Sequence, residues 1–432
     1  MSSQRHVGVD EQEHTESQEL TAFRRKARSF LTEHAPKRVA RSDDQATPFE
    51  ATAPDIASQK RFQAALADAG LVGITLPKPW GQGFTAEYQH VFNDESVDYA
   101  LPTNAFLIGL GMVIPTIIEF GTDAQRERYV ARAIRGEEIW SQLFSEPGAG
   151  SDVASLQMRA DRDGDEWTLN GQKVWTTGAQ VSDFGAVIAR TNPDKPKHRG
   201  ITMFIVDFKA PGVEIRPLRQ MNGGSGFNEV FFTDVRIPDA NRIGGVDDGW
   251  RCAIAMLMNE RVAIGAGGGG GRSVGVGPLI ELARRRGRLE DPLVRQGIAD
   301  VYIRTRILGF IGQRTRDAVK AGRAPGPEGS IAKLVGALLA RRTSDLGIAI
   351  AGAGGQAWED PRDARWSLGV LSAPASRIAG GTDEVQRNII GERVLGLPKE
   401  PQVDREIPFR ELKVSTHSPE ARRVNPETSC PS

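Results

Sequence analysis

The sequence predicts an α+β fold in which a helical region is followed by a β region and then by a second helical region. Apolar residues recur at helical spacing from about Leu20 to Glu138 and again from about Trp250 to Leu397. Between them, short runs rich in β-branched and aromatic residues alternate with turn residues. With 432 residues, the chain is long enough for several structural units and a substantial core.

The first helical region is expected over residues 20–140. The runs FRRKARSFLTEH and RFQAALADAGL place apolar residues three and four positions apart, and Gly70 suits the end of the second of these helices. The stretch FLIGLGMVIPTIIEFG is almost wholly apolar, which predicts a buried helix pair broken at Pro115. Residues 1–19 and 401–432 are polar and poor in aromatic residues, so both are expected to form flexible tails.

The central region, residues 141–245, is predicted to be a β domain. The runs FGAVIART, GITMFIVDF, GVEIRPL and NEVFFTDVRI are each rich in residues that favour strands. EWTLNGQKVWTT is predicted to form a hairpin that turns at Asn170 and Gly171, because Asn-Gly favours two-residue hairpin turns. Helical spacing resumes afterwards, and the second helical region is expected over residues 246–400.

Composition argues against several classes of protein. Lys+Arg and Asp+Glu number 55 each, so a field strong enough to hold a nucleic acid is not expected. No apolar run reaches the roughly 18 residues that span a bilayer, and the start has no apolar signal-peptide core. Cys252 and Cys430 are the only cysteines, which fits a reducing compartment better than a disulfide framework. We therefore expect a cytoplasmic protein without nucleic-acid or membrane partners.

The motif SEPGAGSD, residues 145–152, is the first that could carry chemistry. Its proline and glycines give a tight backbone that can approach a ligand, and Ser145 and Ser151 place hydroxyl groups beside it. Taken alone, a plain loop between domains is an equally good interpretation.

Two further motifs could contact a ligand. In KVWTTG, residues 173–178, Trp175 could lie against a flat heteroaromatic ring and Thr177 could donate to its polar edge, although a tryptophan on a strand is more often core. In AGGTDEVQRNIIGERVLGLP, residues 379–398, two glycines lead into a helix that its acidic first turn favours. A loop capped by Thr382 is the simpler interpretation of this last motif.

The glycine-rich run that starts at Gly265 satisfies the pattern G-x-G-x-x-G over residues 265–270. It follows a predicted helix rather than a strand, so it is not a dinucleotide-binding fingerprint. Five consecutive glycines would weaken a helix by about 1 kcal/mol each relative to alanine. Two interpretations stay open: the helix frays there, or the glycines make room for a bulky ligand.

These motifs together resemble successive signatures of the acyl-CoA dehydrogenase family. They are SEPGAGSD, NGQKVWTTG, FFTDVRIPDANRIGGVDDGW and GGTDEVQRNIIGERVLGLP, and ADAGLVGITLPKPWGQG resembles part of the family's first helical domain. The resemblance covers roughly Leu20 to Glu400. It implies an N-terminal helical domain, a central β-barrel-like domain and a C-terminal four-helix bundle. It also implies a FAD-dependent oxidation of an acyl-CoA thioester to trans-2-enoyl-CoA, electron transfer to an electron-transfer flavoprotein, and a homodimer, homotetramer or heteromer.

The resemblance assigns flavin contacts to both the β region and the bundle. In this sequence the matching positions are Gln142, Phe144, Ser145, Trp175, Thr177, Thr382 and Glu384. Ser151 matches a position that touches the CoA part of the substrate. The family grips the adenosine end partly with an Arg-x-x-Phe-Gly segment of a neighbouring subunit. This chain departs from that segment and reads RRRGRLEDP, so that Arg285 and Gln296 take the matching places. No metal ligands are expected.

The implied reaction needs a carboxylate in a dry pocket to remove a weakly acidic proton α to a carbonyl. Many family members carry this base directly before the Gly-Thr of the last motif, where this chain has Gly380. A second branch, which includes isovaleryl-CoA dehydrogenases, carries it in a Glu-Arg pair on a bundle helix, and Glu260 and Arg261 stand at that place. The helical neighbours of Glu260 are apolar and would desolvate it: Met256, Leu257, Ala263 and Ile264. A glutamate paired structurally with an arginine is the alternative.

Gly380 keeps its backbone N–H, which in the family helps a ribityl hydroxyl to polarise the thioester carbonyl. Arg261 is expected to order the pocket around the CoA chain. Two other functions stay open. One is a catalytically weak or structural subunit of a heteromeric acyl-CoA dehydrogenase, which the departures at Gly380 and RRRGRLEDP favour. The other is a flavin monooxygenase on the same fold, which likewise lacks the usual glutamate. The acyl group itself is not revealed by the sequence.

Overall fold

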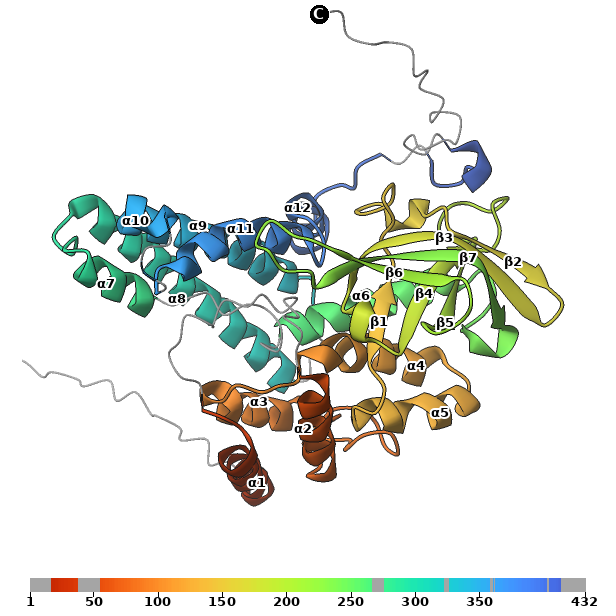
Figure 1. Ribbon diagram of the computed structural model, residues 1–432, viewed down its shortest axis with the longest axis horizontal. Coiled ribbons are helices and arrows are strands. Elements are labelled where there is room, and N and C mark those ends of the chain that lie inside the picture. Colours follow the sequence, from red (N-terminus) through yellow and green to blue (C-terminus); the bar gives the residue numbers. More distant parts are fainter. Residues whose placement is uncertain are drawn as a thin grey trace, which may run out of the picture.

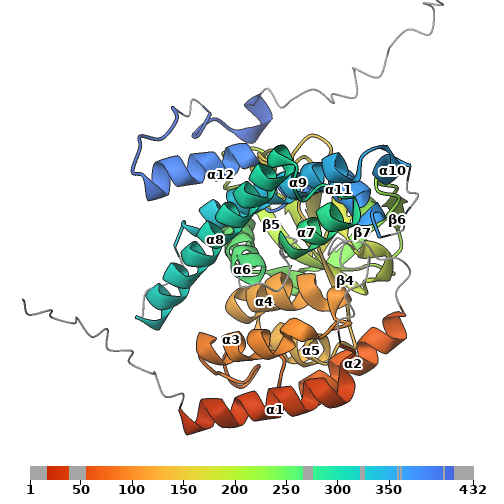
Figure 2. The ribbon, with the colours of Figure 1, turned by 90° about the vertical axis from the view of Figure 1, so that its left-hand side faces the viewer.

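The computed structural model describes residues 17–37, 55–265, 276–321, 326–357, 360, 362–401 and 404–412. Within them, helices come first, an eight-stranded sheet follows, and helices return (Figure 1). The sheet lies at one end of the molecule, the N-terminal helices lie beneath it, and the C-terminal helices extend to the other end (Figures 1 and 2). The predicted α+β class, with a β domain between two helical regions, is confirmed.

The N-terminal helices bury one apolar face each, as their spacing predicts. Gly70 ends the second helix with φ +62°, and the N–H of Leu71 donates to the carbonyl of Leu66 at 3.0 Å, which is a Schellman-type cap. The helices are α1 (Gln18–His34), α2 (Ile56–Asp68), α3 (Ala86–Glu95), α4 (Ile114–Phe120) and α5 (Asp123–Ile134).

The expected break at Pro115 does not occur. A π-helical turn, η3 (Gly109–Val113), runs directly into α4, and Pro115 lies in the first turn of that helix. The regular hydrogen-bond pattern is already interrupted at the π turn, so the missing N–H of the proline breaks no continuous helix. The segment is nevertheless buried, as its apolar sequence predicts.

The sheet is organised around β4, which is buried along nearly its whole length. Ala186 and Ile188 of β4 pack into the core shared with the helices, whereas Val187 and Ala189 pack into the core inside the β domain. This alternation is the period of two that a strand imposes. The strands are β1 (Trp140–Leu143), β2 (Arg159–Asp163), β3 (Glu166–Thr177), β4 (Phe184–Arg190), β5 (Ile201–Asp207), β6 (Val213–Leu218), β7 (Phe227–Pro238) and β8 (Arg242–Ile243).

Most neighbouring strands are antiparallel, in the order β6-β7-β3-β2-β4-β5-β8. The exceptions are β1 and β2, which both run parallel to β4. Since β1 is parallel to β4, Gln142 lies opposite Ala186.

The predicted hairpin turn at Asn170 and Gly171 is wrong. β3 is continuous there, and the pair forms an irregularity in its register with β7, with Gly171 at φ +146°. The side chain of Asn170 exchanges two hydrogen bonds with Asp234 across the strands, at 3.0 and 2.9 Å. The turn lies earlier, between Asp163 and Glu166, so that β3 can pair with β7 over both halves of the sequence run. An Asn-Gly pair serves a bulge as well as a turn because both need unusual backbone angles.

The C-terminal helices form an elongated bundle around the long helices α8 and α9 (Figure 1). The helix α6 joins it to the β domain by packing against β5, η3 and α9. The helices are α6 (Gly249–Gly265), α7 (Val276–Arg285), α8 (Pro292–Lys320), α9 (Gly329–Ala351), α10 (Ala353–Gln356), α11 (Ala364–Ile378) and α12 (Asp383–Ile389). None of the helices within the described ranges is long and apolar enough to cross a membrane.

The glycine-rich run follows a helix, as predicted, because Gly265 is the last residue of α6. Residues 266–270 of that run lie outside the described part of the chain. The expected C-terminal tail differs from the prediction where it is described. Residues 404–412 return to the β domain, where Pro408 bridges to Pro196 and Phe409 contacts Arg190 (Figure 1).

Candidate functional site

The loop after β1 is tied to the middle of β3. The motif SEPGAGSD begins with a tight turn in which Glu146 and Ala149 exchange backbone hydrogen bonds at 3.0 Å. The N–H of Val174 on β3 donates to the carbonyl of Ser145 at 2.9 Å. Phe144 is buried just before this point. The first and second sequence motifs are therefore parts of one structural unit.

A buried ion pair fixes that unit. Lys173 is 0% exposed, and its Nζ donates to Glu146 Oε1 at 2.8 Å and to the carbonyl of Phe144 at 3.1 Å. Glu146 also accepts from the backbone N–H groups of Gln157 and Met158 at 2.7 and 3.0 Å. Burial lowers the pKa of Lys173, and the adjacent carboxylate of Glu146 opposes that shift. Because Lys173 and Glu146 bond to backbone groups of the loop as well as to each other, the conformation of the loop is fixed.

Trp175 is displayed by a bulge in β3. The register with β7 shifts by one residue between Lys173 and Thr176, so that β3 carries one extra residue there. Trp175 takes φ +61°, which is rare for a residue with a side chain, and 60% of it is exposed. Its ring contacts Phe227 edge-on, with 6.0 Å between centroids. Strained backbone at an exposed aromatic residue is typical of a binding site.

Two polar side-chain atoms on β1 and β3 lack partners. Gln142 Nε2 and Thr176 Oγ1 are buried, and neither has a hydrogen-bond partner within the described residues. Their strands, β1 and β3, are in contact. Thr177 follows at the end of β3 and is half-buried, and its carbonyl accepts from Ser141 Oγ at 2.8 Å. A flat ring with donors and acceptors on its edge fits this set of residues, as a flavin would.

The bundle contributes a glycine turn in front of α12. Gly380 and Gly381 take φ +66° and +91°, which only glycine adopts readily. The buried side chain of Gln386 donates from Nε2 to the carbonyl of Gly380 at 2.9 Å, and Lys333 Nζ donates to the carbonyl of Gly381. The two carbonyls are thus held from α12 and α9, which leaves the N–H of Gly380 in a fixed orientation.

The first turn of α12 is capped as predicted. Thr382 Oγ1 accepts from the N–H of Val385 at 3.2 Å. Glu384 is exposed, and it pairs with Arg387 at 3.4 Å. The buried acid of this turn is instead Asp383, which accepts from Arg377 Nε at 2.6 Å.

The β domain and the bundle are linked by the loop between β6 and β7. Asn222 Nδ2 in that loop donates to Ser372 Oγ on α11 at 3.0 Å. Gln142, Phe144, Ser145, Trp175 and Thr177 gather on and after the adjoining strands β1 and β3, while Thr382 and Glu384 start α12. Ser151 is exposed on the loop that follows the tight turn.

The positions matched to adenosine contacts lie elsewhere. Arg285 ends α7, at the end of the bundle far from the sheet (Figure 1), and it pairs with Asp360 at 3.1 Å and with buried Asp363 at 2.7 Å. Gln296 is exposed on α8, next to Gly297. Gly297 lines a groove of about 550 Å³ between α8 and α9. The other lining residues are Arg304, Val335, Leu338, Leu339, Arg341, Arg342, Asp345 and Leu346.

The side chains of Glu260 and Arg261 lie outside the described part of the structure. Their backbone belongs to α6. Cys252, Ala253 and Met256 form the buried face of that helix, and Glu260 follows Met256 by four residues. Helical spacing therefore predicts that Glu260 lies on the continuation of the buried face.

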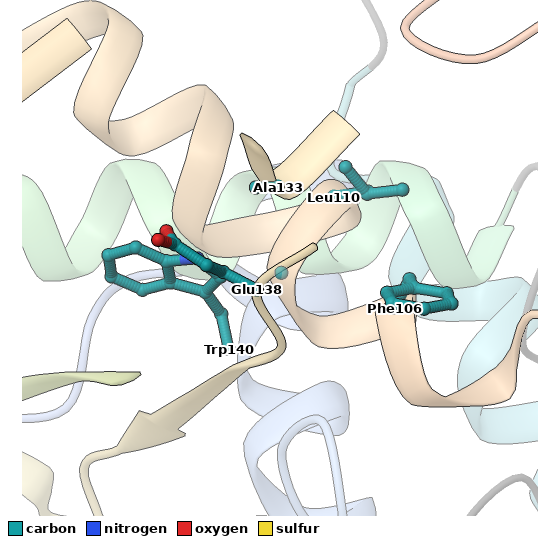
Figure 3. A pocket seen from close by; sticks show the side chains of 6 residues that line it. Phe106, Leu110, Ala133, Glu138 and Trp140 are labelled. Carbon is teal, nitrogen blue, oxygen red and sulfur yellow. The ribbon is translucent and has the colours of Figure 1, made fainter. Parts of the chain in front are cut away.

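A second small pocket, which shares no residue with the predicted flavin contacts, lies where β1 begins (Figure 3). It is lined by Phe106, Gly109, Leu110, Ala133, Glu138 and Trp140. Figure 3 shows the carboxylate of Glu138 over the indole of Trp140, with Phe106 and Leu110 on the other side. One oxygen of Glu138 accepts from Arg128 at 2.6 Å, so this carboxylate serves an ion pair at the helix α5.

The sequence interpretation missed the residues that hold the site together. These residues are Lys173, Glu146, Gln386 and Lys333, and the first three lie inside the quoted motifs. The available signal was a lysine at an inward position of a strand, which a buried partner must satisfy. The partners of Gln386 and Lys333 are backbone carbonyls, which a sequence pattern does not reveal.

Comparison with known families covers nearly all of the described chain. Residues 17–137 match the family model described as "Acyl-CoA dehydrogenase, N-terminal domain". Residues 141–235 match "Acyl-CoA dehydrogenase, middle domain", and residues 247–395 match "Acyl-CoA dehydrogenase, C-terminal domain".

Individual proteins show the same likeness. "Acyl-CoA dehydrogenase FadE34" of Mycobacterium tuberculosis is 38% identical over 79% of this chain, which spans 47% of that relative, or about half of its length. "Acyl-CoA dehydrogenase IpdE1" of the same organism is 36% identical over 79% of this chain and 89% of its own length. Among solved structures, "Tcur3481-Tcur3483 steroid ACAD" is 26% identical, covers 89% of this chain and 99% of that chain, and superposes with a TM-score of 0.74.

Proposed function

This chain belongs to the acyl-CoA dehydrogenase family, and we propose that it oxidises an acyl-CoA thioester to its trans-2-enoyl form with FAD as cofactor. The observation that carries the proposal is the bulge that displays Trp175 on β3, together with the unpaired Gln142 Nε2 and Thr176 Oγ1 on the contacting strands β1 and β3. A strained, exposed indole and unsatisfied buried polar atoms on neighbouring strands are costly to maintain unless a ligand compensates them.

Gln142, Trp175 and Thr177 would hold the flavin from the β domain, and Thr382 would approach it from the bundle. Ser145 and Phe144 contribute the loop that Lys173 fixes beneath them. FAD held by these residues would supply an acceptor for the hydride that leaves the β carbon of the substrate. The protein supplies the surface that orients the ring and excludes water from it.

Glu260 is the proposed base that removes the α proton. Its place on the continuation of the buried face of α6 would desolvate the carboxylate and strengthen it as a base. Gly380 cannot act as a base, but its N–H can donate to the thioester carbonyl as negative charge develops there. Gln386 and Lys333 support this role by holding the carbonyl groups of the glycine turn. Arg261 and Ser151 are proposed to contact the CoA part.

Anaerobic titration of the purified protein with acyl-CoA thioesters tests this function. The panel should include straight-chain, branched and steroid-derived acyl groups, the last because one similar structure is a steroid ACAD. We expect the flavin absorbance to bleach with at least one substrate and to return on addition of an electron-transfer flavoprotein. Tight FAD binding without bleaching by any acyl-CoA would contradict the proposal.

A non-catalytic subunit of a heteromeric acyl-CoA dehydrogenase is the second candidate function. Two observations favour it: Gly380 replaces the usual base, and a similar structure carries two component names, Tcur3481 and Tcur3483. Under this alternative the chain alone comes out colourless and gains FAD and activity only with a companion chain. Under the first proposal the chain alone is yellow and active.

We further propose that the chain assembles with a second copy of itself through α8. Four large apolar side chains are about half exposed on this helix, in a stripe that a monomer would leave in water: Tyr302, Ile303, Ile307 and Phe310. Their spacing of one, four and three residues keeps them on one side of the helix. Light scattering of the purified chain measures the assembly. A monomer at micromolar concentration would contradict the self-association, and a complex formed only with a companion would favour the heteromer.

A further inference from the structure

The segment 404–412, which returns from the bundle, is attached to the β domain at several points. Its backbone pairs with the loop after β4, because the N–H of Phe409 donates to the carbonyl of Lys195 at 2.9 Å and the N–H of Arg410 donates to that of Pro193 at 3.0 Å. Pro408 and Pro196 form an antiparallel bridge beside these bonds. Such paired backbone groups indicate a docked segment rather than a passing chain.

Phe409 covers a buried cation. The guanidinium of Arg190 lies 3.8 Å from the centre of the Phe409 ring, and Arg190 is almost wholly buried. Burial lowers the pKa of Arg190 to about 10, so the group is still charged at neutral pH. A cation that has lost its water depends on such an aromatic face and on its hydrogen bonds.

The hydrogen bonds of Arg190 lead to the turn formed by residues 151–157, which follows the tight turn of SEPGAGSD. Arg190 Nη2 donates to the carbonyls of Ala154 at 2.6 Å and of Leu156 at 3.3 Å, while Nη1 donates to that of Lys197 at 2.7 Å. The guanidinium thus holds this turn through its Nη2 atom, and the ring of Phe409 covers the flat face of the guanidinium.

A second set of hydrogen bonds also links the segment 404–412 to the 151–157 turn. Lys197 Nζ donates to Asp404 Oδ2 at 2.8 Å and to Asp152 Oδ2 at 2.9 Å, which joins the segment to the residue after Ser151. Asp152 also accepts from Ser155 Oγ at 2.5 Å within the turn. Burial opposes the charge of Lys197, but the bonds to Asp404 and Asp152 outweigh it, and the pKa of Lys197 is raised. These two connections reach the turn from the same segment.

We propose that residues 404–412 are a brace that positions the 151–157 turn, and with it Ser151, for binding the CoA part of the substrate. The inference rests on the proposed function, because Ser151 is assigned there to the CoA contact. Phe409 and Asp404 are positioning residues in this view, since they act through Arg190 and Lys197 and touch no substrate. An acyl-CoA dehydrogenase lacking the brace would still bind flavin and still carry its base.

Three variants of the full-length protein test the brace: Phe409→Ala, Asp404→Asn and the control Glu406→Gln. Glu406 pairs with Arg199 at 3.5 Å, and both side chains are about two-thirds exposed, so its loss leaves the two connections intact. Hydrogen exchange of peptides that cover residues 151–157 reports the turn directly. We expect Phe409→Ala to speed this exchange by roughly two- to thirtyfold, the range of a cation–π contact at exposed to desolvated sites, and Asp404→Asn to speed it less.

Steady-state kinetics and CoA binding then separate positioning from simple stability. For Phe409→Ala we expect a rise in KM for the acyl-CoA and in Kd for free CoA by a similar factor, with kcat and the flavin spectrum unchanged. Equal exchange in Phe409→Ala and the parent overturns the brace, as does faster exchange with unchanged Kd for free CoA. A parent chain that turns over no acyl-CoA contradicts the proposed function instead, and exchange and free-CoA affinity still decide the brace.

Discussion

The two halves of the candidate site are stabilised by different kinds of interaction. On the β domain, the flavin contacts are fixed by strand register and by the fully buried pair of Lys173 and Glu146. On the bundle, the turn at Gly380 and Gly381 is held by glycine conformations and by side chains that bond to its carbonyls. The first half, which we call the β platform, is fixed by a buried ion pair, whereas the second is fixed by hydrogen bonds to backbone carbonyls.

This difference shows where chemical variation is tolerated. A side chain at position 380 can be lost without disturbing the turn, because the turn depends on φ angles that glycine favours. A change at Lys173 would remove the support of the β platform and leave Glu146 buried without its cation. We therefore expect that the bundle can carry the catalytic base at more than one position in the sequence, whereas the flavin contacts must stay on β3.

The largest effect is expected at the base, on the bundle side. Glu260→Gln should reduce the rate of acyl-CoA dehydrogenation by roughly 10²- to 10⁴-fold, the usual contribution of a general base, while FAD stays bound. Anaerobic bleaching rates measure this, with FAD content read from the visible spectrum. Glu281→Gln is the matched control, because Glu281 is exposed on α7 and has no proposed role in the site, so its loss should change the rate little. A Glu260→Gln variant as fast as the parent would show that the base lies elsewhere.

The order of the fold could be predicted from the sequence better than the local geometry of the candidate site. The motifs around Trp175 were recognisable through their resemblance to the family, and the α+β order followed from periodicity. The bulge at Trp175 and the irregularity at Gly171 were not, since both depend on which strand pairs with β3. The fixing of the glycine turn depends on Lys333, which donates to the carbonyl of Gly381 48 residues later in the chain, and no local pattern encodes such a contact. The docking of residues 404–412 was missed for the same reason.

The next effect tests the rigidity of the β platform. Lys173→Met should destabilise the protein by about 3–5 kcal/mol, because it leaves the buried carboxylate of Glu146 without its cation. Urea unfolding measures this free energy. Lys209→Met is the control, since Lys209 is highly exposed and lies 3.9 Å from Asp183, where an ion pair contributes little. A loss of less than 1 kcal/mol in Lys173→Met would mean that the platform does not depend on the pair.

A smaller, pH-dependent effect tests the register of β3 against β7. Asp239 accepts from Trp167 Nε1 at 2.7 Å and from Arg242 at 3.0 Å, and these bonds lower its pKa to about 2 from 3.8. Because the folded pKa is depressed, the stabilisation is present above pH 4 and is lost as the pH falls towards 2. Asp239→Asn should therefore cost about 1 kcal/mol at pH 7, because water screens the partly exposed pair, and almost nothing near pH 2. Unfolding curves across this range measure it, and a difference independent of pH would argue against the ionised pair.

The smallest effect separates folding from function at Trp175 itself. Its φ of +61° is unfavourable for any residue with a side chain, so Trp175→Gly relieves strain, but it also removes the buried part of the ring and its contact with Phe227. We expect the free energy of unfolding of this variant to lie within about 1 kcal/mol of the parent value, because the lost burial and glycine's greater freedom in the unfolded chain offset the relief of strain. FAD titration by fluorescence should nevertheless show much weaker binding, while Trp175→Phe keeps both the strain and most of the affinity. If Trp175→Gly lost stability and kept its FAD, the bulge would serve the fold, and the β half of the site would need another flavin contact.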